Sequence, residues 1–383
     1  MKTKFLLFTV TILLSTNIVF ATFSDTIWVL PTPAGSIETS INKDTALDGS
    51  RKNPNRVYAL YADSVYTQQS PIVANNLGGN LQIVGQTGGS LPVWLKVQKN
   101  GKPVGINNIS GGLKLQNIQY ENTETAGVLP QTAFNITGAN SHLTVDNCLV
   151  ENCNLQWCDV DGVPVGAEVR ITNSYFRDFN DWSQWWAGRV VEMKVPIDTL
   201  KIENNTFTSC GLTFLAQNDL IEYAFINHNT FINNTKYPFL NQYWKECYFT
   251  NNLFVNANWV GEDTINVANA GTAPPPRSDG QLVLQGIFGV DTIIPGEIAI
   301  NPKWYVNGTS GTLKDGLALN ELKIYAADNI VTYSSTLNNY YNGKADSILV
   351  GARADKIDGK KATTPLSYLN WNAAQLMLHL LRY

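Results

Sequence analysis

The chain contains an internal repeat that leaves few folds open to it. Six segments share one template of eight residues, with apolar side chains at the first and third positions, Asn or His at the fifth and an apolar or aromatic residue at the eighth. The fifth positions are residues 117, 147, 173, 204, 228 and 251, so successive copies lie 30, 26, 31, 24 and 23 residues apart. Such self-similarity predicts a stack of small units rather than one compact core.

Each copy has the features of one turn of a parallel β-helix. The alternating apolar residues before the fifth position indicate a half-buried strand. Asn tolerates the left-handed backbone conformation, so it bends the chain into a second short strand that returns an aromatic residue to the core. The copies are too short for propeller blades and lack the helical spacing of ankyrin repeats. We therefore expect equivalent residues to stack about 4.8 Å apart.

Stacking predicts columns of like residues. The first apolar column should contain Tyr120, Val150, Phe176, Phe207, Phe231 and Phe254. The second should contain Leu115, Val145, Ile171, Ile202, Ile226 and Phe249. A polar column, five positions after each corner, is expected to form amide hydrogen bonds along the stack: Asn122, Asn152, Asp178, Ser209, Asn233 and Asn256. A weaker copy starts at Leu81, and a further candidate copy starts at Leu282.

These rungs resemble the right-handed parallel β-helix of the secreted pectate-lyase-like superfamily. The segment 55–66 is similar to the strand that opens secreted bacterial members, and the resemblance covers roughly residues 50 to 300. It implies an all-β fold, a right-handed parallel β-helix built as a single-stranded solenoid with N- and C-terminal caps. In that superfamily the substrate lies along the outer face of the first strand of each turn. Lyases, hydrolases and adhesins all share this scaffold, so the resemblance specifies fold rather than activity.

The ends of the chain carry different signals. Lys2 and Lys4 precede the apolar run 5–14, and Ala21 offers a small residue for cleavage, which is typical of a secretory signal peptide. We expect a signal peptide over 1–21, an N-terminal cap and first strands over 22–80, a β-helix over 81–300 and a C-terminal cap region over 301–383. Ser36 to Ala46 and Leu376 to Leu381 could form capping helices, and no clear rung recurs beyond Asn301.

Export follows from these signals as an expectation. The apolar run near the start is shorter than the about 20 residues that a membrane-spanning helix needs, and no later stretch qualifies. We expect a secreted or cell-surface protein with no membrane span after signal removal, and a monomer. With 27 basic and 31 acidic residues and no basic run, the chain does not have the charge of a nucleic-acid-binding protein.

All five cysteines fall within the repeats and are interpreted as structural. Cys153 and Cys210 share a column but lie two rungs apart, about 9.6 Å, which exceeds the roughly 7 Å reach of a disulfide. Cys247 replaces an inward aliphatic residue, and a free buried cysteine behaves as a small hydrophobic side chain. Bridges between Cys148 and Cys153 or between Cys153 and Cys158 stay open as alternatives.

The segment 178–194 is the richest in candidate binding residues. Trp182, Trp185 and Trp186, with Asp181, could form a platform on which sugar rings stack. Large aromatic side chains can equally cover the core beneath a loop. Arg189, Glu192 and Lys194 follow on a predicted strand, where Glu192 and Lys194 share a face, and are the candidate catalytic residues. A solvated ion pair is the alternative explanation for them.

A calcium site is a further hypothesis. Asp159 and Asp161 place two carboxylates on one strand face, and Asp178 or Asp181 could add a third from the next rung, a set that suits Ca²⁺. An ordinary turn at Asp161-Gly162 explains the same residues. If the site were real, the metal would neutralise a uronate carboxylate, and uncharged Arg189 or Lys194 would remove the adjacent proton. The resembling lyases use calcium and a basic residue, but their motifs do not match this chain residue by residue.

Three functions remain open from the sequence. The chain could bind an extracellular polysaccharide or cell-surface glycan without turnover, or degrade it as a polysaccharide lyase or glycoside hydrolase in the same groove. It could also be a non-catalytic surface or adhesive structural protein, for which a rigid stack of repeats is sufficient.

Overall fold

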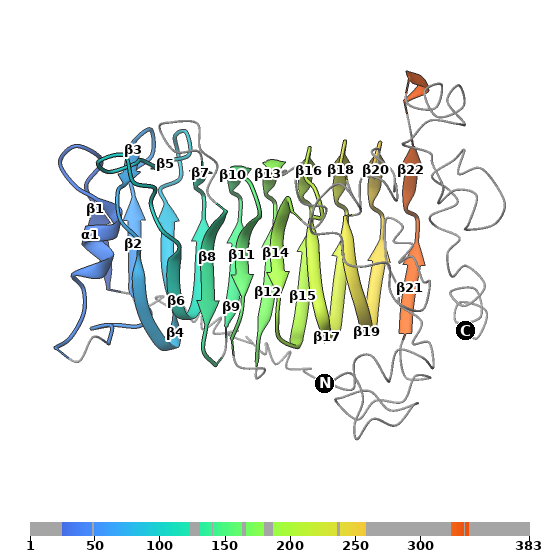
Figure 1. The fold of residues 1–383 in the computed structure, drawn as a ribbon, viewed down its shortest axis with the longest axis horizontal. Coiled ribbons are helices and arrows are strands. Elements are labelled where there is room, and N and C mark those ends of the chain that lie inside the picture. The colour runs from blue at the N-terminus through green and yellow to red at the C-terminus, as the bar shows by residue number, and fades with distance from the viewer. Residues whose placement is uncertain are drawn as a thin grey trace, which may run out of the picture.

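The protein folds as a parallel β-helix (Figure 1). The structure, a computed structural model, describes residues 25–47, 50–122, 131–139, 141–162, 166–179, 187–235, 238–257, 323–332 and 334–336. Over these residues the strands form one sheet of 13 strands and one of 9 strands, and the strands within each sheet pair in parallel. The all-β solenoid predicted from the repeat is thus confirmed.

The larger sheet contains β1 (Thr26–Val29), β2 (Val57–Leu60), β4 (Val73–Gly85), β6 (Asn107–Gln116), β8 (Thr132–Thr137), β9 (His142–Asp146), β11 (Gln156–Val160), β12 (Glu168–Thr172), β14 (Arg189–Met193), β15 (Ile197–Glu203), β17 (Phe214–Asn227), β19 (Phe239–Thr250) and β21 (Lys323–Ala327). The smaller sheet contains β3 (Val65–Gln68), β5 (Val93–Lys96), β7 (Gln119–Glu121), β10 (Leu149–Cys153), β13 (Tyr175–Phe179), β16 (Thr206–Thr208), β18 (Thr230–Ile232), β20 (Leu253–Val255) and β22 (Ile330–Thr332).

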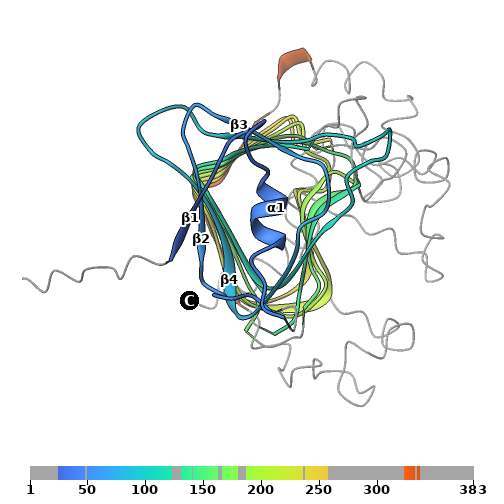
Figure 2. The same cartoon turned by 90° about the vertical axis from the view of Figure 1, so that its left-hand side faces the viewer.

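The larger sheet bends, so the solenoid has three faces. Strand β6 pairs with both β8 and β9, and β17 pairs with both β14 and β15. These long strands therefore cross a corner. We call the side with β8, β11 and β14 face 1, the side with β9, β12 and β15 face 2, and the smaller sheet face 3. Figure 2, which looks along the stack, shows the three-sided outline.

The corners between faces 2 and 3 confirm the role predicted for the fifth template position. All six residues there have the left-handed backbone: Asn117, Asn147, Asn173, Asn204, His228 and Asn251, with φ between 50° and 58°. Most residue types lose about 1–2 kcal/mol in this conformation, whereas Asn can form local hydrogen bonds in it. The asparagines of the repeat thus define where the chain turns.

Both apolar columns are confirmed by the strand register. Phe176 pairs with Phe207, Phe207 with Phe231 and Phe231 with Phe254. The ring centroids of these neighbours are 5.4, 4.8 and 4.8 Å apart, and the rings are nearly parallel. Burying side chains of this size supplies most of the stability of each turn, because each removes a large apolar area from water.

The polar column forms a predicted amide hydrogen bond, from Asn256 Nδ2 to Asn233 Oδ1 at 2.9 Å, and it also has a role that was not predicted. From Asn152 onward its members form a second corner, with positive φ at Asn152, Asp178, Ser209, Asn233 and Asn256. The main buried amide ladder lies one residue after the first corner, at Asn205, Asn229, Asn252 and Asn329. Each Nδ2 donates to the Oδ1 of the next rung at 3.1, 3.0 and 2.9 Å.

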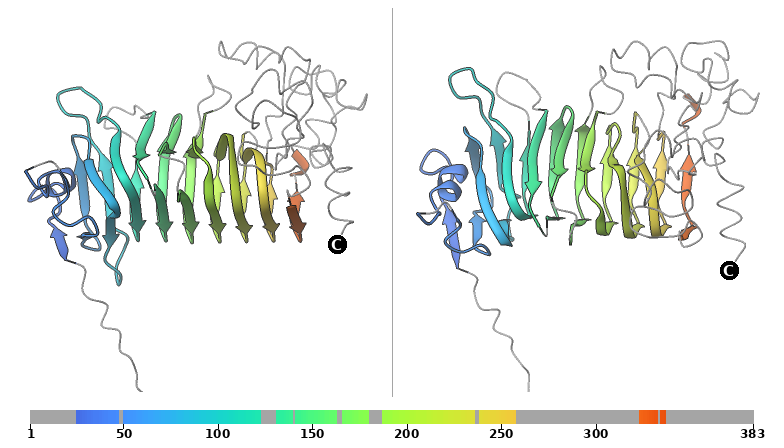
Figure 3. Two further views of the ribbon diagram at one scale, coloured as in Figure 1. Left: turned by 90° about the horizontal axis from the view of Figure 1, so that it is seen from below. Right: turned by 60° about the horizontal axis from the view of Figure 1, so that its bottom comes forward.

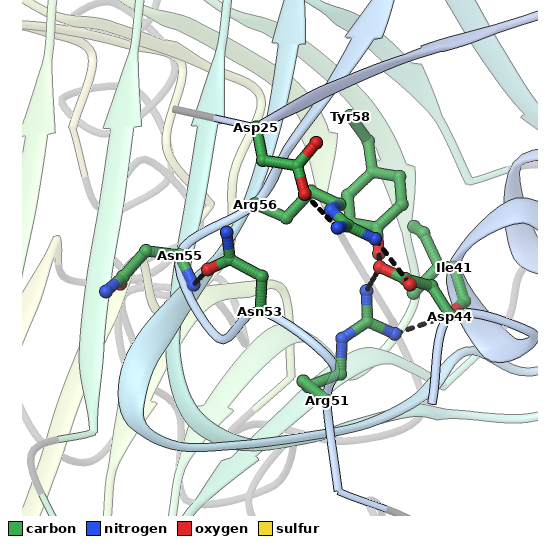
Figure 4. A network of polar contacts seen from close by, with 8 residues as sticks. All are labelled: Asp25, Ile41, Asp44, Arg51, Asn53, Asn55, Arg56 and Tyr58. Carbon is green, nitrogen blue, oxygen red and sulfur yellow. Dashed lines mark hydrogen bonds and ion pairs between the residues drawn. The ribbon is translucent and has the colours of Figure 1, made fainter. Parts of the chain in front are cut away.

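The N-terminal cap contains helix α1 (Ile37–Asn42), within the predicted range 36–46. It begins after Ser36, whose Oγ accepts a hydrogen bond from the Thr39 amide at 3.2 Å. The helix lies across the end of the first turn (Figure 2). Behind it, buried Asp44 pairs with Arg56 at 2.5 Å and Arg51 at 3.5 Å, and it accepts a hydrogen bond from the Tyr58 hydroxyl at 2.7 Å (Figure 4). This network connects the cap to strand β2.

At the other end the stack continues further than predicted. Strands β21 and β22 pair with β19 and β20, and Asp328 takes the corner position with φ of 56°. We expected no rung beyond Asn301. The repeat was hidden because the ladder residues Asn252 and Asn329 are 77 positions apart and Ala326 weakens the apolar pattern. Figure 3 shows this last rung aligned with the others. The candidate copy at 282 and the segments 1–21 and 376–381 lie outside the described residues.

The cysteines behave as predicted. All five are buried and free, and Cys247 pairs in register with Ala224 in an inward column. Burial raises the pKa of the Cys148 and Cys153 thiols to about 12, so they stay protonated and unreactive. Among the described residues, no helix has the length and apolarity needed to cross a membrane.

Candidate functional site

Face 1 presents polar side chains outward through a shared irregularity of its strands. In β14, Val190, Val191 and Met193 belong to the hydrophobic core, whereas Arg189 and Glu192 do not. The amides of Val190 and Val191 both donate to the carbonyl of Thr213, which is the pattern of a β-bulge. Two consecutive side chains therefore point inward, and residues three apart point outward together.

The same order recurs on the neighbouring rungs. In β11 the core side chains are Trp157, Cys158 and Val160, and in β8 they are Ala133, Phe134 and Ile136. The outward positions line up by register, because Arg189 pairs with Gln156 and Gln156 with Thr132. A second outward column joins Glu192, Asp159, Asn135 and Asn108. A third outward column lies beside the second. In it Ser110 and Thr137 pair in register, and the next two rungs contribute Asp161 and Lys194, which come directly after β11 and β14.

Gly188 directly precedes β14 and adopts a backbone conformation that favours glycine. Its φ is 85°, and a Cβ there would lie 2.4 Å from the Phe179 carbonyl oxygen and 2.6 Å from the Gly211 amide nitrogen. Another residue would collide with the backbone on both sides. The glycine therefore permits the entry that places Arg189 at the start of the strand.

The charged residues of β11 and β14 form one connected cluster. The Lys194 Nζ lies 2.9 Å from Asp159 Oδ2 and 3.8 Å from Glu192 Oε2. The Arg189 guanidinium pairs with Glu192 at 3.1 Å and also donates to the Gln156 side-chain oxygen. Gln156 in turn donates to Asp159 Oδ2 at 2.7 Å. The structure thus brings together all three predicted catalytic residues and Asp159.

Burial controls the protonation of this cluster. Glu192 and Arg189 are each only 3% exposed. Burial raises the pKa of Glu192, and the neighbouring Asp159 carboxylate adds to the shift, while Arg189 and Lys194 oppose it. Burial also lowers the pKa of Arg189, against the attraction of Glu192 and Asp159. For Lys194, burial acts to lower the pKa, but the hydrogen bond and charge of Asp159 outweigh it and the net shift is upward.

These directions bear on the proposed lyase base. A base must be uncharged to accept a proton, and the raised pKa of Lys194 keeps it protonated. Arg189 is buried and held by Glu192 and Gln156. The ion pair between Arg189 and Glu192 is also buried, whereas a solvated pair was the alternative expected from the sequence. The geometry therefore supports neither cation as the proton acceptor.

The three predicted calcium ligands are not brought together. Asp159 is buried on face 1, and Asp161 follows just beyond β11 with an exposed side chain. Asp178 is exposed in β13 on face 3, at a corner with φ of 62°. Within the described residues no group of three or more His, Cys, Asp or Glu side chains is placed to hold a metal ion. The predicted platform residues Asp181, Trp182, Trp185 and Trp186 lie outside the described residues.

Sequence reasoning missed the uncharged part of the site. We use the name polar strip for the outward side chains of face 1: Asn108, Ser110, Thr132, Asn135, Thr137, Gln156, Asp159, Asp161, Arg189, Glu192 and Lys194. Two of its buried oxygens, Asn135 Oδ1 and Asp159 Oδ1, and the Arg189 Nε have no hydrogen-bond partner within the described part of the chain. The signal in the sequence was the pair Asn-Ile-Ser and Asn-Ile-Thr at 108 and 135, which have the same polar and apolar order.

Comparison with known proteins does not assign the chain to a family. No family model, no curated protein and no solved structure matches the chain.

Proposed function

We propose that the chain is an exported, carbohydrate-associated β-helix of the pectate-lyase-like type, which binds an extended extracellular polysaccharide along the polar strip. The observation that carries the proposal is the register of the strip, in which polar side chains occupy the outward positions of four consecutive rungs. A polymer of sugars repeats its hydroxyl groups along its length, and such a regular array of amides, hydroxyls and charges can bond to them in series.

Two features of the fold favour this ligand. The strip lies on face 1, whose strands β8, β11 and β14 pair in register from one turn to the next. It is also built on strands whose inward residues are fixed in the core, so the polar groups are already in position before binding. Sites held on rigid elements lose less conformational entropy when a ligand binds.

Hydrolysis is a second candidate, favoured by one observation. Glu192 and Asp159 are register neighbours, burial raises the pKa of Glu192, and Lys194 Nζ lies 2.9 Å from Asp159 Oδ2. Glycoside hydrolysis uses two carboxyl groups, one that donates a proton and one that is ionised. β-Elimination is less favoured, because both cations that could act as the base are paired. If neither binding nor turnover is found, the remaining alternative is a non-catalytic surface or adhesive structural protein.

A steric block tests the binding proposal. Thr137 and Thr144 are both half-buried threonines of the same turn, but Thr137 belongs to the strip and Thr144 faces outward on face 2. In affinity electrophoresis against a panel of plant and microbial polysaccharides, Thr137→Arg should weaken binding about tenfold or more, and Thr144→Arg should leave it unchanged. Equal loss in both variants, or no binding by the wild-type chain, contradicts the proposal.

Turnover is tested separately on the polysaccharide that binds. New reducing ends that disappear in Glu192→Gln and in Asp159→Asn, with binding retained, would support hydrolysis. Ultraviolet absorbance from unsaturated uronate products would instead show a lyase and contradict the assignment of the carboxyl pair.

A further inference from the structure

Among the residues that the structure describes, specific hydrogen-bonding groups of the polar strip have no partners, and these groups constrain the ligand. Asp159 is 7% exposed, its Oδ2 is bonded by Lys194 and Gln156, and its Oδ1 is buried with no partner. On the preceding rung the Asn135 Oδ1 is also buried without a partner. On the following rung the buried Arg189 Nε has no acceptor. Leaving such groups unpaired costs about 1–3 kcal/mol each, so a ligand that pairs them gains that energy.

Two acceptors and one donor on adjacent rungs define the chemistry of the missing group. A hydroxyl donates and accepts at the same time, whereas a carboxylate only accepts and an ammonium only donates. Sugar hydroxyls can therefore donate to Asn135 and Asp159 and accept from Arg189. A carboxylate in the same place would meet two oxygen acceptors and could pair only with the Arg189 donor.

The charge of the strip also excludes a strong anion site. Its two cations, Arg189 and Lys194, already pair with Glu192 and Asp159, and Asp161 adds another carboxylate. Toward the N-terminal rungs the strip contains only neutral side chains: Asn108, Ser110, Thr132, Asn135, Thr137 and Gln156. No net positive charge is left to attract a polyuronate.

One column of the strip has a defined end. The column that contains Asn135, Asp159 and Glu192 continues on β17 with Leu215, an apolar residue. In this column the outward polar side chains therefore run from β6 to β14 and toward the N-terminal rungs.

We infer that the polar strip selects a neutral polysaccharide, one whose hydroxyls pair with Asn135 and Asp159, over an acidic one. This inference rests on the proposed function, since it names the substrate class of the same site. Neutral glucans, galactans, mannans and xylans belong to the expected class, and polygalacturonate and alginate do not.

Isothermal titration with neutral and uronate oligosaccharides of equal length tests the inference. The wild-type chain should bind at least one neutral oligosaccharide about tenfold or more tightly than any uronate. Asn135→Leu, which removes the acceptor while keeping the size of the side chain, should weaken neutral binding about tenfold. Thr144→Val on face 2 is the matched control and should bind as the wild type does. Melting temperatures of both variants show whether the fold is retained.

The outcomes separate the inference from the proposed function. Binding of uronates equal to or tighter than that of neutral sugars would overturn the inference and leave polysaccharide binding intact. Binding of Ca²⁺ alone that is lost in Asp159→Asn would also overturn it, because a cation would then fill the acceptor pair. No binding of any oligosaccharide or polysaccharide would overturn both. If Asn135→Leu binds normally while preserving its melting temperature, the residue assignment is wrong.

Discussion

Arg189 and Glu192 lie three residues apart on β14, so strict alternation would direct them to opposite sides of the strand. The bulge at Val190 and Val191 places them on the same side, where they form a buried ion pair at 3.1 Å. Glu192 was identified from the sequence as facing the same way as Lys194, which the structure confirms. The contact with Arg189 depends on a bulge that has no separate signature in the sequence.

The raised pKa of Glu192 predicts a pH dependence of stability. A carboxyl whose pKa is higher in the folded than in the unfolded state stabilises the fold below its unfolded pKa, and this contribution is lost as the pH rises through the folded pKa. In Glu192→Gln that loss should be absent. Thermal melting of both proteins between about pH 4 and 8 should therefore show a smaller decline of Tm toward neutral pH in the variant. A parallel decline in the two proteins would contradict the assignment.

At the scale of the element, the asparagine ladder connects each turn to the next. Asn229 is 1% exposed, and its Nδ2 donates to the Ile202 carbonyl at 2.7 Å and to Asn252 Oδ1 at 3.0 Å. Its own Oδ1 accepts from the amide and side chain of Asn205. These bonds satisfy backbone groups that the corner would otherwise leave buried and unpaired.

Removing one member of the ladder should therefore be costly. Asn229→Ala leaves several buried partners unsatisfied and should lower the free energy of unfolding by about 2–3 kcal/mol. Asn108→Ala is the matched control, since Asn108 is exposed on β6 and should change stability by less than about 0.5 kcal/mol. Urea denaturation measures both values. Equal effects would mean that the ladder contributes no more than a surface amide.

At the scale of the whole molecule, a solenoid is stabilised by contacts between neighbouring turns, so its ends are the weakest parts. The N-terminal end is closed by α1 and by the network around Asp44 (Figure 4). Asp44 and Arg51 are both buried, so removing the acid would leave the buried Arg51 guanidinium without its acidic partner. Breaking a buried pair in this way costs about 3–5 kcal/mol.

Asp44→Ala should therefore destabilise the cap selectively. Hydrogen exchange should become faster in β1 and β2, while exchange in β16 and β18 stays at the wild-type rate. Glu203→Ala, which removes a half-buried partner of Lys201, should cost no more than about 1 kcal/mol and should leave exchange in the cap unchanged. Uniformly faster exchange along the stack would show that the cap and the distant turns unfold as one unit.

The sequence by itself determined the fold, because the repeat combines a strand period, a left-handed corner and an inward aromatic in every copy. Those are local requirements, and the residues at 117, 147, 173, 204, 228 and 251 meet them without help from distant parts of the chain. Rung spacing alone also excluded a disulfide between Cys153 and Cys210, whereas the other two possible bridges were excluded only by the structure.

The tertiary structure determined which residues that are distant in the sequence become neighbours, and local sequence patterns do not carry this information. The bulges of face 1 determine which polar side chains meet. The strand register places Asn135 next to Asp159, although the sequence between them shows no pattern that predicts this contact. The last rung was also missed from the sequence, because its ladder residue Asn329 follows its neighbour Asn252 by 77 residues in the chain. Its short strands lack the apolar strength of the other copies, and they are held in place by pairing with β19 and β20. Register and long-range pairing are properties of neighbours in space, and for this reason the uncharged part of the candidate site became visible only in the folded chain.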